Sequence, residues 1–187
     1  MSKLTRELAS VIAPLKKKEE AAAIKVAQAH LGGELSDHYR IFGAELRVDK
    51  PREPGKRPSR MVGVLVVDYG NRRNLEVLVD TGAKVVRVDD LGGAQPAYTD
   101  EEIKEAREIA EQDSRAARFA KMKGLFVSEF GPERASDNAR RIGLRYAVIG
   151  KRGSGRVLTH AAHALVDMSA RKLVHFEEAP NEEEPRR

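Results

Sequence analysis

The chain has 187 residues, of which 34 are Lys or Arg and 29 are Asp or Glu, so its formal net charge is +5. This small excess is far from the single-signed composition of a dedicated nucleic-acid coat protein. The absence of cysteine excludes disulfides, thiolate metal sites and cysteine nucleophiles. The N-terminus lacks the apolar core of a secretory signal and no apolar run reaches 18 residues, so we expect a cytoplasmic protein without a membrane segment.

Apolar periodicity predicts two helices and four strands in the first half of the chain. The helices are expected over residues 3–15 and 16–31, and the second should end at Gly32 in a left-handed C-cap. Alternation of apolar and polar residues predicts strands over 39–48 (with a bulge at Gly43), 61–69, 75–80 and 85–91.

Thr99 and Glu102 begin the next predicted helix. Their spacing is that of a capping box, in which each side chain accepts a hydrogen bond from the backbone amide of the other residue. Apolar residues at helical spacing continue to Ala110, and a further helical piece over 114–123 is expected to follow a bend. The remaining strands are predicted over 125–130, 142–149, 157–166 and 172–177.

The second half of the chain repeats the first. Leu-Val-Asp at 78–80 returns 87 residues later at 165–167, and Asp89-Asp90 returns 88 residues later as Glu177-Glu178, so the second turn has one extra residue. Each half reads as a helix followed by a four-stranded meander, and the helix can bury its apolar face by lying across one face of the sheet. We therefore predict an α+β protein of two tandem cystatin-like α-β-β-β-β units plus an N-terminal helix.

The predicted domain boundaries follow from this repeat. They are residues 1–15 for the N-terminal helix, 16–93 for the first cystatin-like unit, 97–179 for the second, and 180–187 for a disordered acidic tail.

The stretch VLVDTGAKVVRVDDLGGAQPAYTDEEIKEAREIA resembles the paired cystatin-like N-terminal domains of copper amine oxidases. The pieces that carry the resemblance are Val79-Asp80, Val85-Val86, Asp89-Asp90, Gly93-Ala94-Gln95-Pro96 and Thr99-Asp100-Glu101-Glu102-Ile103. The C-terminal ALVDMSARKLVHFEEAP repeats the first part, and the likeness extends over about residues 14–180. It implies the same fold and a surface that faces a partner.

The catalytic parts of those oxidases have no counterpart in this sequence. The family makes its quinone from a Tyr in an Asn-Tyr-Asp/Glu sequence and holds copper with three His residues. None of the four tyrosines has such neighbours, and no His-x-His pair is present. We therefore expect no catalytic residues, no cofactor and no metal.

A basic segment over residues 50–60 is the main candidate for a nucleic-acid site. It carries five cations and one anion, and clustered cations are enough for phosphate binding. Exposed aromatic residues, which single-strand binding would need, are few. The residues of this alternative site are Lys50, Arg52, Lys56, Arg57 and Arg60.

Three other features have a structural and a functional interpretation. His160 and His163 should lie on opposite faces of a strand, and His163 could face His175, which gives at most two metal ligands where stable sites usually need three or four. Asp80 and Asp167 could be general acids, but their repetition favours turns in which each binds its own backbone. The Gly-rich residues 151–156 precede a strand rather than a helix, which favours a hairpin over a phosphate loop.

The sequence thus favours a non-catalytic protein–protein binding or assembly module. Sheet edges, long loops and the tail would be its contact surfaces. Its partner would be another protein or a second copy, because residues 1–15 offer an apolar helix face that neither repeat requires. The alternative is a basic nucleic-acid-binding protein that uses residues 50–60.

Overall fold

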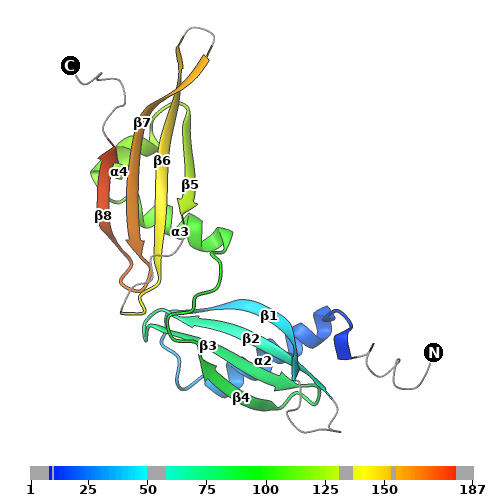
Figure 1. Cartoon of the computed structure of the whole chain (residues 1–187). Helices are drawn as coiled ribbons and strands as arrows, with labels where there is room; N and C mark the ends of the chain where they lie inside the picture. Colours follow the sequence, from blue (N-terminus) through cyan, green and yellow to red (C-terminus); the bar gives the residue numbers. More distant parts are fainter. Residues whose placement is uncertain (1–8, 10, 50–57, 131–136, 153–154, 180–187) are drawn as a thin grey trace. The chain divides into compact units, whose positions relative to one another are not determined.

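The computed structural model describes residues 9, 11–49, 58–130, 137–152 and 155–179. The chain divides into two compact units, Met1–Pro96 and Ala97–Arg187 (Figure 1). Each unit contains a four-stranded antiparallel sheet in which neighbours in sequence are neighbours in space. The prediction of an α+β fold with two cystatin-like units and an N-terminal helix is confirmed.

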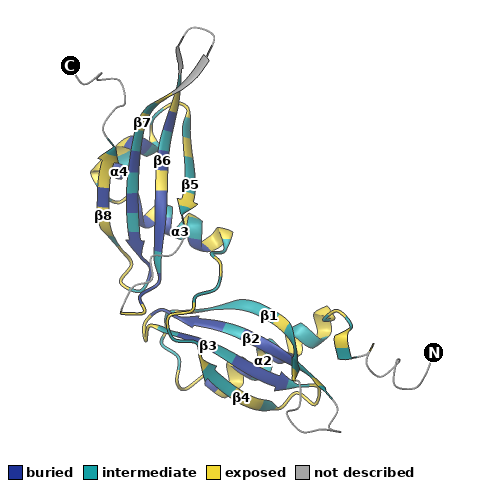
Figure 2. Cartoon of the chain, in the orientation of Figure 1, coloured by how far each residue is buried: buried dark blue, intermediate teal, exposed yellow. Residues whose placement is uncertain are grey.

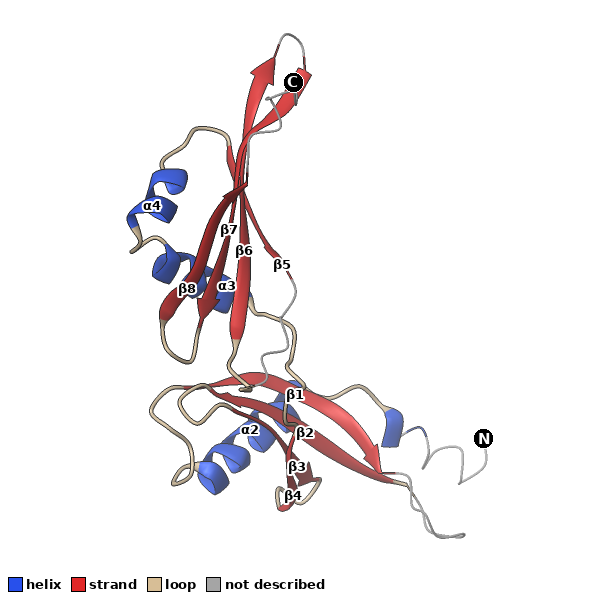
Figure 3. Ribbon diagram, turned by 60° about the vertical axis from the view of Figure 1, so that its left-hand side comes forward, coloured by secondary structure: helices blue, strands red, loops and turns tan. Residues whose placement is uncertain are grey.

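In the first unit one helix covers one face of the sheet (Figure 3). Ala23, Ala27 and Leu31 are on the inner face of this helix, where small side chains allow close approach to the Val-rich central strands. Figure 2 shows the resulting burial along those strands. The elements are α2 (Lys17–Leu31), β1 (Tyr39–Asp49), β2 (Ser59–Asp68), β3 (Arg73–Asp80) and β4 (Val85–Asp90).

Two local predictions for this unit have opposite outcomes. The bulge at Gly43 is confirmed, because the β1–β2 register shifts between Ile41 and Gly43, and Gly43 has φ of 135°, which favours glycine. The left-handed C-cap at Gly32 is wrong, since its φ is −55° and ψ is −22°. The chain instead continues in a right-handed turn, in which the amide of Leu35 donates to the carbonyl of Leu31, and Leu35 packs against the core.

The N-terminal helix is described only in part. Residues 9, 11 and 12 are helical, whereas residues 1–8 and 10 lie outside the described residues. Leu15 packs against the core of the first unit, while the Ile12 residue is 65% exposed. Part of the apolar face expected here is therefore used within the first unit.

The second unit places two helices beside its sheet. The capping box is confirmed: the amide of Glu102 donates to Oγ1 of Thr99 at 3.2 Å, and the amide of Thr99 donates to Oε2 of Glu102 at 3.2 Å. The predicted continuation is a separate short helix with Asp113 as its own N-cap. The elements are α3 (Asp100–Ala110), α4 (Ser114–Ala120), β5 (Leu125–Phe130), β6 (Arg141–Arg152), β7 (Gly155–Asp167) and β8 (Lys172–Ala179).

Aromatic side chains fill the core between α4 and the second sheet. The Phe119 ring lies edge-on to Tyr146 and Phe176, with centroid distances of 6.1 and 6.0 Å. All three residues are buried. Such pairs contribute about 0.5–1.5 kcal/mol beyond their area, so this cluster fixes the short helix on the sheet.

The strand register shows the duplication directly. Met61 pairs with Asp80 in the first sheet, and Arg141 pairs with Asp167 in the second. Each last strand then has a bulge, at Val86 in β4 and at Val174 in β8, because each of these residues is skipped in the pairing. The repeat therefore extends to irregular details of the backbone.

Among the described residues, no helix is long and apolar enough to cross a membrane.

Candidate functional site

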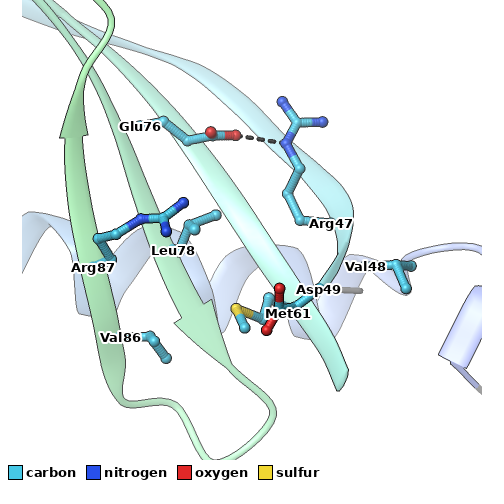
Figure 4. Close-up of a pocket in the computed structure, with 8 residues that line it drawn as sticks. All are labelled: Arg47, Val48, Asp49, Met61, Glu76, Leu78, Val86 and Arg87. Atoms are coloured by element: carbon cyan, nitrogen blue, oxygen red, sulfur yellow. Dashed lines mark hydrogen bonds and ion pairs between the residues drawn. The ribbon is translucent and has the colours of Figure 1, made fainter. Parts of the chain in front are cut away.

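A cleft of about 300 Å³ lies over the first sheet (Figure 4). Pockets that bury small ligands have volumes of about 300–1,000 Å³, so this cleft is sized for a small group or for one or two side chains. It is built by all four strands of the unit. Its lining residues are Arg47, Val48, Asp49, Met61, Glu76, Leu78, Val86 and Arg87.

An ion pair between Arg47 and Glu76 spans the sheet at one end of the cleft. Nε of Arg47 lies 2.6 Å from Oε1 of Glu76, although the two residues are on strands β1 and β3. The pair passes over Gly63 of β2, where a Cβ atom would clash with Glu76 Oε1 and crowd Cγ of Arg47. The glycine is therefore required for this ion pair to form across the central strand.

Two carboxylates accept hydrogen bonds from the guanidinium group of Arg47 and stabilise its charge. Partial burial alone would lower the pKa of Arg47, but hydrogen bonds to Glu76 and Glu45 outweigh it and raise the pKa. The side chain of Glu76 is only 14% exposed, whereas that of Arg47 is 40% exposed. This end of the cleft therefore presents a fixed guanidinium group to solvent.

Val86 and Arg87 of β4 form the opposite side of the cleft. Arg87 pairs with Asp89 at 2.8 Å, and its side chain is 64% exposed. Val86 is the bulged residue and is 53% exposed. Between the two sides lie Met61 and Leu78, so the cleft has apolar side chains at its floor and guanidinium groups at its borders (Figure 4). The carboxylates of Asp49 and Glu76 also line the cleft.

Of the five cations predicted for a nucleic-acid site, the structure describes only Arg60. Its side chain is 11% exposed, and its guanidinium group donates to both carboxylate oxygens of Glu19 at 3.3 and 3.2 Å. It also donates to the carbonyls of Val11, Ala13 and Pro14. Arg60 thus ties the segment before α2 to β2, whereas Lys50, Arg52, Lys56 and Arg57 lie outside the described residues.

The carboxylate of Glu19 joins this arrangement to the helix start. The backbone amide of Lys16 and the guanidinium of Arg60 both lower the pKa of Glu19. A second cleft of about 370 Å³ lies beside these residues, with Ala23, Val62 and Val79 among its lining. Because Arg60 already donates to protein acceptors, the described lining of this cleft has no comparably exposed guanidinium group.

Asp80 and Asp167 are turn residues, as predicted. Oδ1 of Asp80 accepts hydrogen bonds from the amides of Gly82 and Lys84, both at 2.9 Å. Oδ1 of Asp167 accepts one from the amide of Ala170 at 2.9 Å. These carboxylates therefore stabilise the equivalent hairpin turns.

The histidines do not converge. His160 pairs with Val148 on the helix side, while His163 pairs with Arg145 on the other side. The suggestion that His163 faces His175 is wrong, because the register places His163 opposite Glu177. Within the described part of the chain, no group of three or more His, Cys, Asp or Glu residues could hold a metal ion.

Comparison with solved structures shows a likeness of fold. No protein-family model and no curated protein matches the chain. The copper-containing benzylamine oxidase from Hansenula polymorpha matches with a TM-score of 0.61 and 12% identity over 89% of this chain and 30% of that chain. The likeness is one of fold. The C-terminal domain of Bacillus megaterium YpeB has a TM-score of 0.27 and 8% identity, covering 88% of this chain and 63% of that chain.

The cleft residues were not predicted from the sequence. Arg47 comes to lie beside Met61 only because the bulge at Gly43 sets the β1–β2 register. One sequence signal does point to Val86: Val85 and Val86 are consecutive apolar residues in a strand that otherwise alternates, which is a pattern that a bulge produces. The close approach at Gly63 has no comparable signal.

Proposed function

We propose that the chain is a non-catalytic protein–protein binding module whose partner docks in the cleft of the first sheet. The observation that carries this proposal is the combination of an apolar floor with two partly exposed guanidinium groups, those of Arg47 and Arg87. Arginine is enriched in the parts of interfaces that contribute most to binding, around desolvated apolar pockets. We further propose that the chain corresponds to the non-catalytic N-terminal domains of copper amine oxidases.

The chemistry of the cleft indicates the kind of partner. An apolar side chain would fit against Met61, Leu78 and Val86, and the volume is sufficient for one or two such groups. A neighbouring carboxylate would pair with Arg87, the most exposed cation of the cleft. The partner is therefore a protein segment with an apolar residue beside an acidic one.

Preorganisation supports the same proposal. The guanidinium of Arg47 is held by Glu76 and Glu45 before any partner arrives. Ordering a flexible side chain at an interface costs about 0.5–1.5 kcal/mol. A partner group that meets Arg47 avoids part of this cost.

Site-specific photo-crosslinking tests the proposal. A photoreactive amino acid in place of Val86 should form a discrete protein adduct in an extract of the cells that make the chain. The same amino acid in place of Lys25, which is exposed on α2 and thus on the opposite side of the sheet, is the matched control. We expect the adduct at position 86 alone.

Reversal of the charge at Arg87 provides a second test of docking in the cleft. Arg87→Glu should remove the adduct, because it repels the proposed carboxylate, and this exposed position should tolerate the change without loss of folding. Equal crosslinking at positions 86 and 25, no adduct at position 86, or an adduct unaffected by Arg87→Glu would each contradict docking in this cleft.

A further inference from the structure

The second sheet has an exposed apolar face of its own. This face contains three large hydrophobic residues that are exposed in the described structure. Their exposed fractions are 61% for Phe126, 49% for Leu158 and 38% for Ile149. The alternation along the strands directs them away from α3 and α4, since the intervening residues Tyr146 and Val148 are in the core. We call this surface the second open face.

The side chains of this face fall into rows across the strands. One row contains Phe126, Ala147, Ala161 and Ala179, and the next contains Ser128, Arg145, His163 and Glu177. The first row is apolar and mostly small, so another sheet can approach it to about the 10 Å of face-to-face packing. The second row carries both signs of charge.

We propose that a second copy of this chain packs on the second open face, so that two sheets associate through the same surface. In such a pair the twofold axis lies midway between the two sheets. It runs parallel to the strands, over the line between the central strands β6 and β7. Because the sheet has four strands in the order β5-β6-β7-β8, this axis places β5 of one copy over β8 of the other and β6 over β7. Each surface is then covered by its own copy, as an isologous interface requires.

The sizes of the facing side chains are complementary in this arrangement. Phe126 of one copy lies over Ala179 of the other, and Ala147 lies over Ala161. Ile149 and Leu158, which pair within one sheet, also face each other between copies. Large residues thus meet small ones at the edge, and the two exposed aliphatic residues bury each other.

The charged row is complementary as well. Ser128 faces Glu177 of the other copy and can donate a hydrogen bond to it. Arg145 is exposed and makes no ion pair among the described residues, and in the pair it lies one strand away from Glu177 of the other copy. The side chain of Glu177 is 69% exposed, and its one ion pair among the described residues is a long contact of 3.5 Å to His175, so it is accessible to that guanidinium.

The size of the face sets the expected affinity. Four strands about 4.8 Å apart and six residues at about 3.3 Å each give roughly 400 Å² of plane on each copy. Stable complexes bury roughly 800 Å² per partner, so the pair lies at the weak end of specific interfaces. We expect association in the micromolar range that is lost on dilution.

Sedimentation velocity of the full chain from about 1 to 500 µM tests this directly. We expect a monomer–dimer equilibrium, and Phe126→Glu should weaken it at least tenfold. Tyr39→Glu makes the same aromatic-to-acidic change at an exposed residue of the first unit and should leave the dimer intact. A chain that stays monomeric throughout the range, or a dimer unaffected by Phe126→Glu, would overturn the assignment.

Charge reversal identifies the pairing itself. Arg145→Glu and Glu177→Arg should each weaken the dimer, and the double variant should restore it because the opposite charges meet again between copies. These charge-reversal variants also test the proposed dimer if Phe126→Glu does not fold. Circular dichroism would reveal such a loss of folding. Failure of the double variant to restore the dimer would contradict the proposed axis. Although the dimer assumes the proposed role in protein binding, crosslinking at Val86 reports on the cleft independently.

Discussion

Arg140 and Glu102 form an ion pair in which both side chains are buried. Nη2 of Arg140 lies 2.8 Å from Oε2 of Glu102, and the side chains are 2% and 0% exposed. Nε of Arg140 also donates to Oε1 of Glu102 at 3.0 Å, so the contact is bidentate. The same carboxylate caps the first turn of α3, and the Tyr98 ring packs 4.6 Å from the guanidinium carbon.

The first unit contains the equivalent arrangement. Met61 and Arg141 are equivalent, because they pair with Asp80 and Asp167, and Arg60 and Arg140 directly precede them. Glu19 takes the third helical position of α2, as Glu102 does in α3. In both units the arginine also donates at 3.3 Å to the carbonyl two residues before the N-cap, that of Pro14 or of Ala97. The duplication therefore retains a link between the helix start and the second strand.

Removal of the two arginines should have unequal effects. Arg140→Ala leaves the buried carboxylate of Glu102 without its cation, which should lower the free energy of unfolding by about 3–5 kcal/mol. Arg60→Ala should cost less, because the side chain of Glu19 is 35% exposed and solvent can replace the arginine. Urea denaturation of both variants measures the difference.

An apolar replacement provides the control for the buried pair. Glu102→Leu combined with Arg140→Met removes both charges and should recover most of the stability that Arg140→Ala loses. An equal or larger loss for Arg60→Ala than for Arg140→Ala would show that burial does not determine the cost.

Two tyrosines form a matched pair for hydroxyl removal. The Tyr146 hydroxyl is buried and has no hydrogen-bond partner among the described residues, so Tyr146→Phe should leave stability unchanged or raise it by about 1 kcal/mol. The Tyr98 hydroxyl donates to the carbonyl of Arg141 at 2.8 Å, so Tyr98→Phe should lower stability by about 1 kcal/mol. Thermal unfolding distinguishes the two, and destabilisation by Tyr146→Phe would reveal a partner for that hydroxyl.

Alkaline titration should report the same two side chains. Burial raises the pKa of Tyr98 and of Tyr146 to about 12, against about 10 in an unfolded chain. Each group's contribution is therefore fully present below about pH 10 and is lost as the pH rises towards about 12. Ultraviolet absorbance of tyrosinate should show two late groups, and each Tyr→Phe variant should remove one. Ionisation of both near pH 10 in the folded protein would contradict their burial.

Asp68 should make the first unit sensitive to acid. Burial would raise the pKa of Asp68, but hydrogen bonds from the Ser36 and Asn71 side chains and amides outweigh it and lower the pKa. Its contribution is thus present above the unfolded value of about 3.9 and is lost as the pH falls through the lower folded value.

The corresponding variant is Asp68→Asn. At pH 7 it should lower the free energy of unfolding by about 2 kcal/mol, because an amide supplies one acceptor oxygen where a carboxylate supplies two. The difference from the unchanged chain should shrink as the pH falls below the unfolded value of about 3.9 towards the lower folded value. A difference that stays constant down to pH 2 would show that the charge of Asp68 is not the cause.

The fold could be predicted from the sequence because its determinants are local or repeated. Thr99 and Glu102 lie in one turn, and the Leu-Val-Asp repeat identifies both hairpins. The roles of Arg60 and Arg140 could not be predicted, since each partner carboxylate is about 40 residues away and a cation in a basic segment usually remains solvated. The cleft depends on the bulges at Gly43 and Val86 and on the close approach at Gly63, and of these three features only the bulge at Gly43 was expected.

Val86 and Val174 also affect how the two sheets end. Each lies in the outermost strand of its sheet, where unpaired backbone groups could add strands from other molecules and start cross-β aggregation. A bulged residue breaks the even spacing of those groups, so an incoming strand cannot pair along the whole edge. Duplication has thus preserved in both units a safeguard against fibre formation.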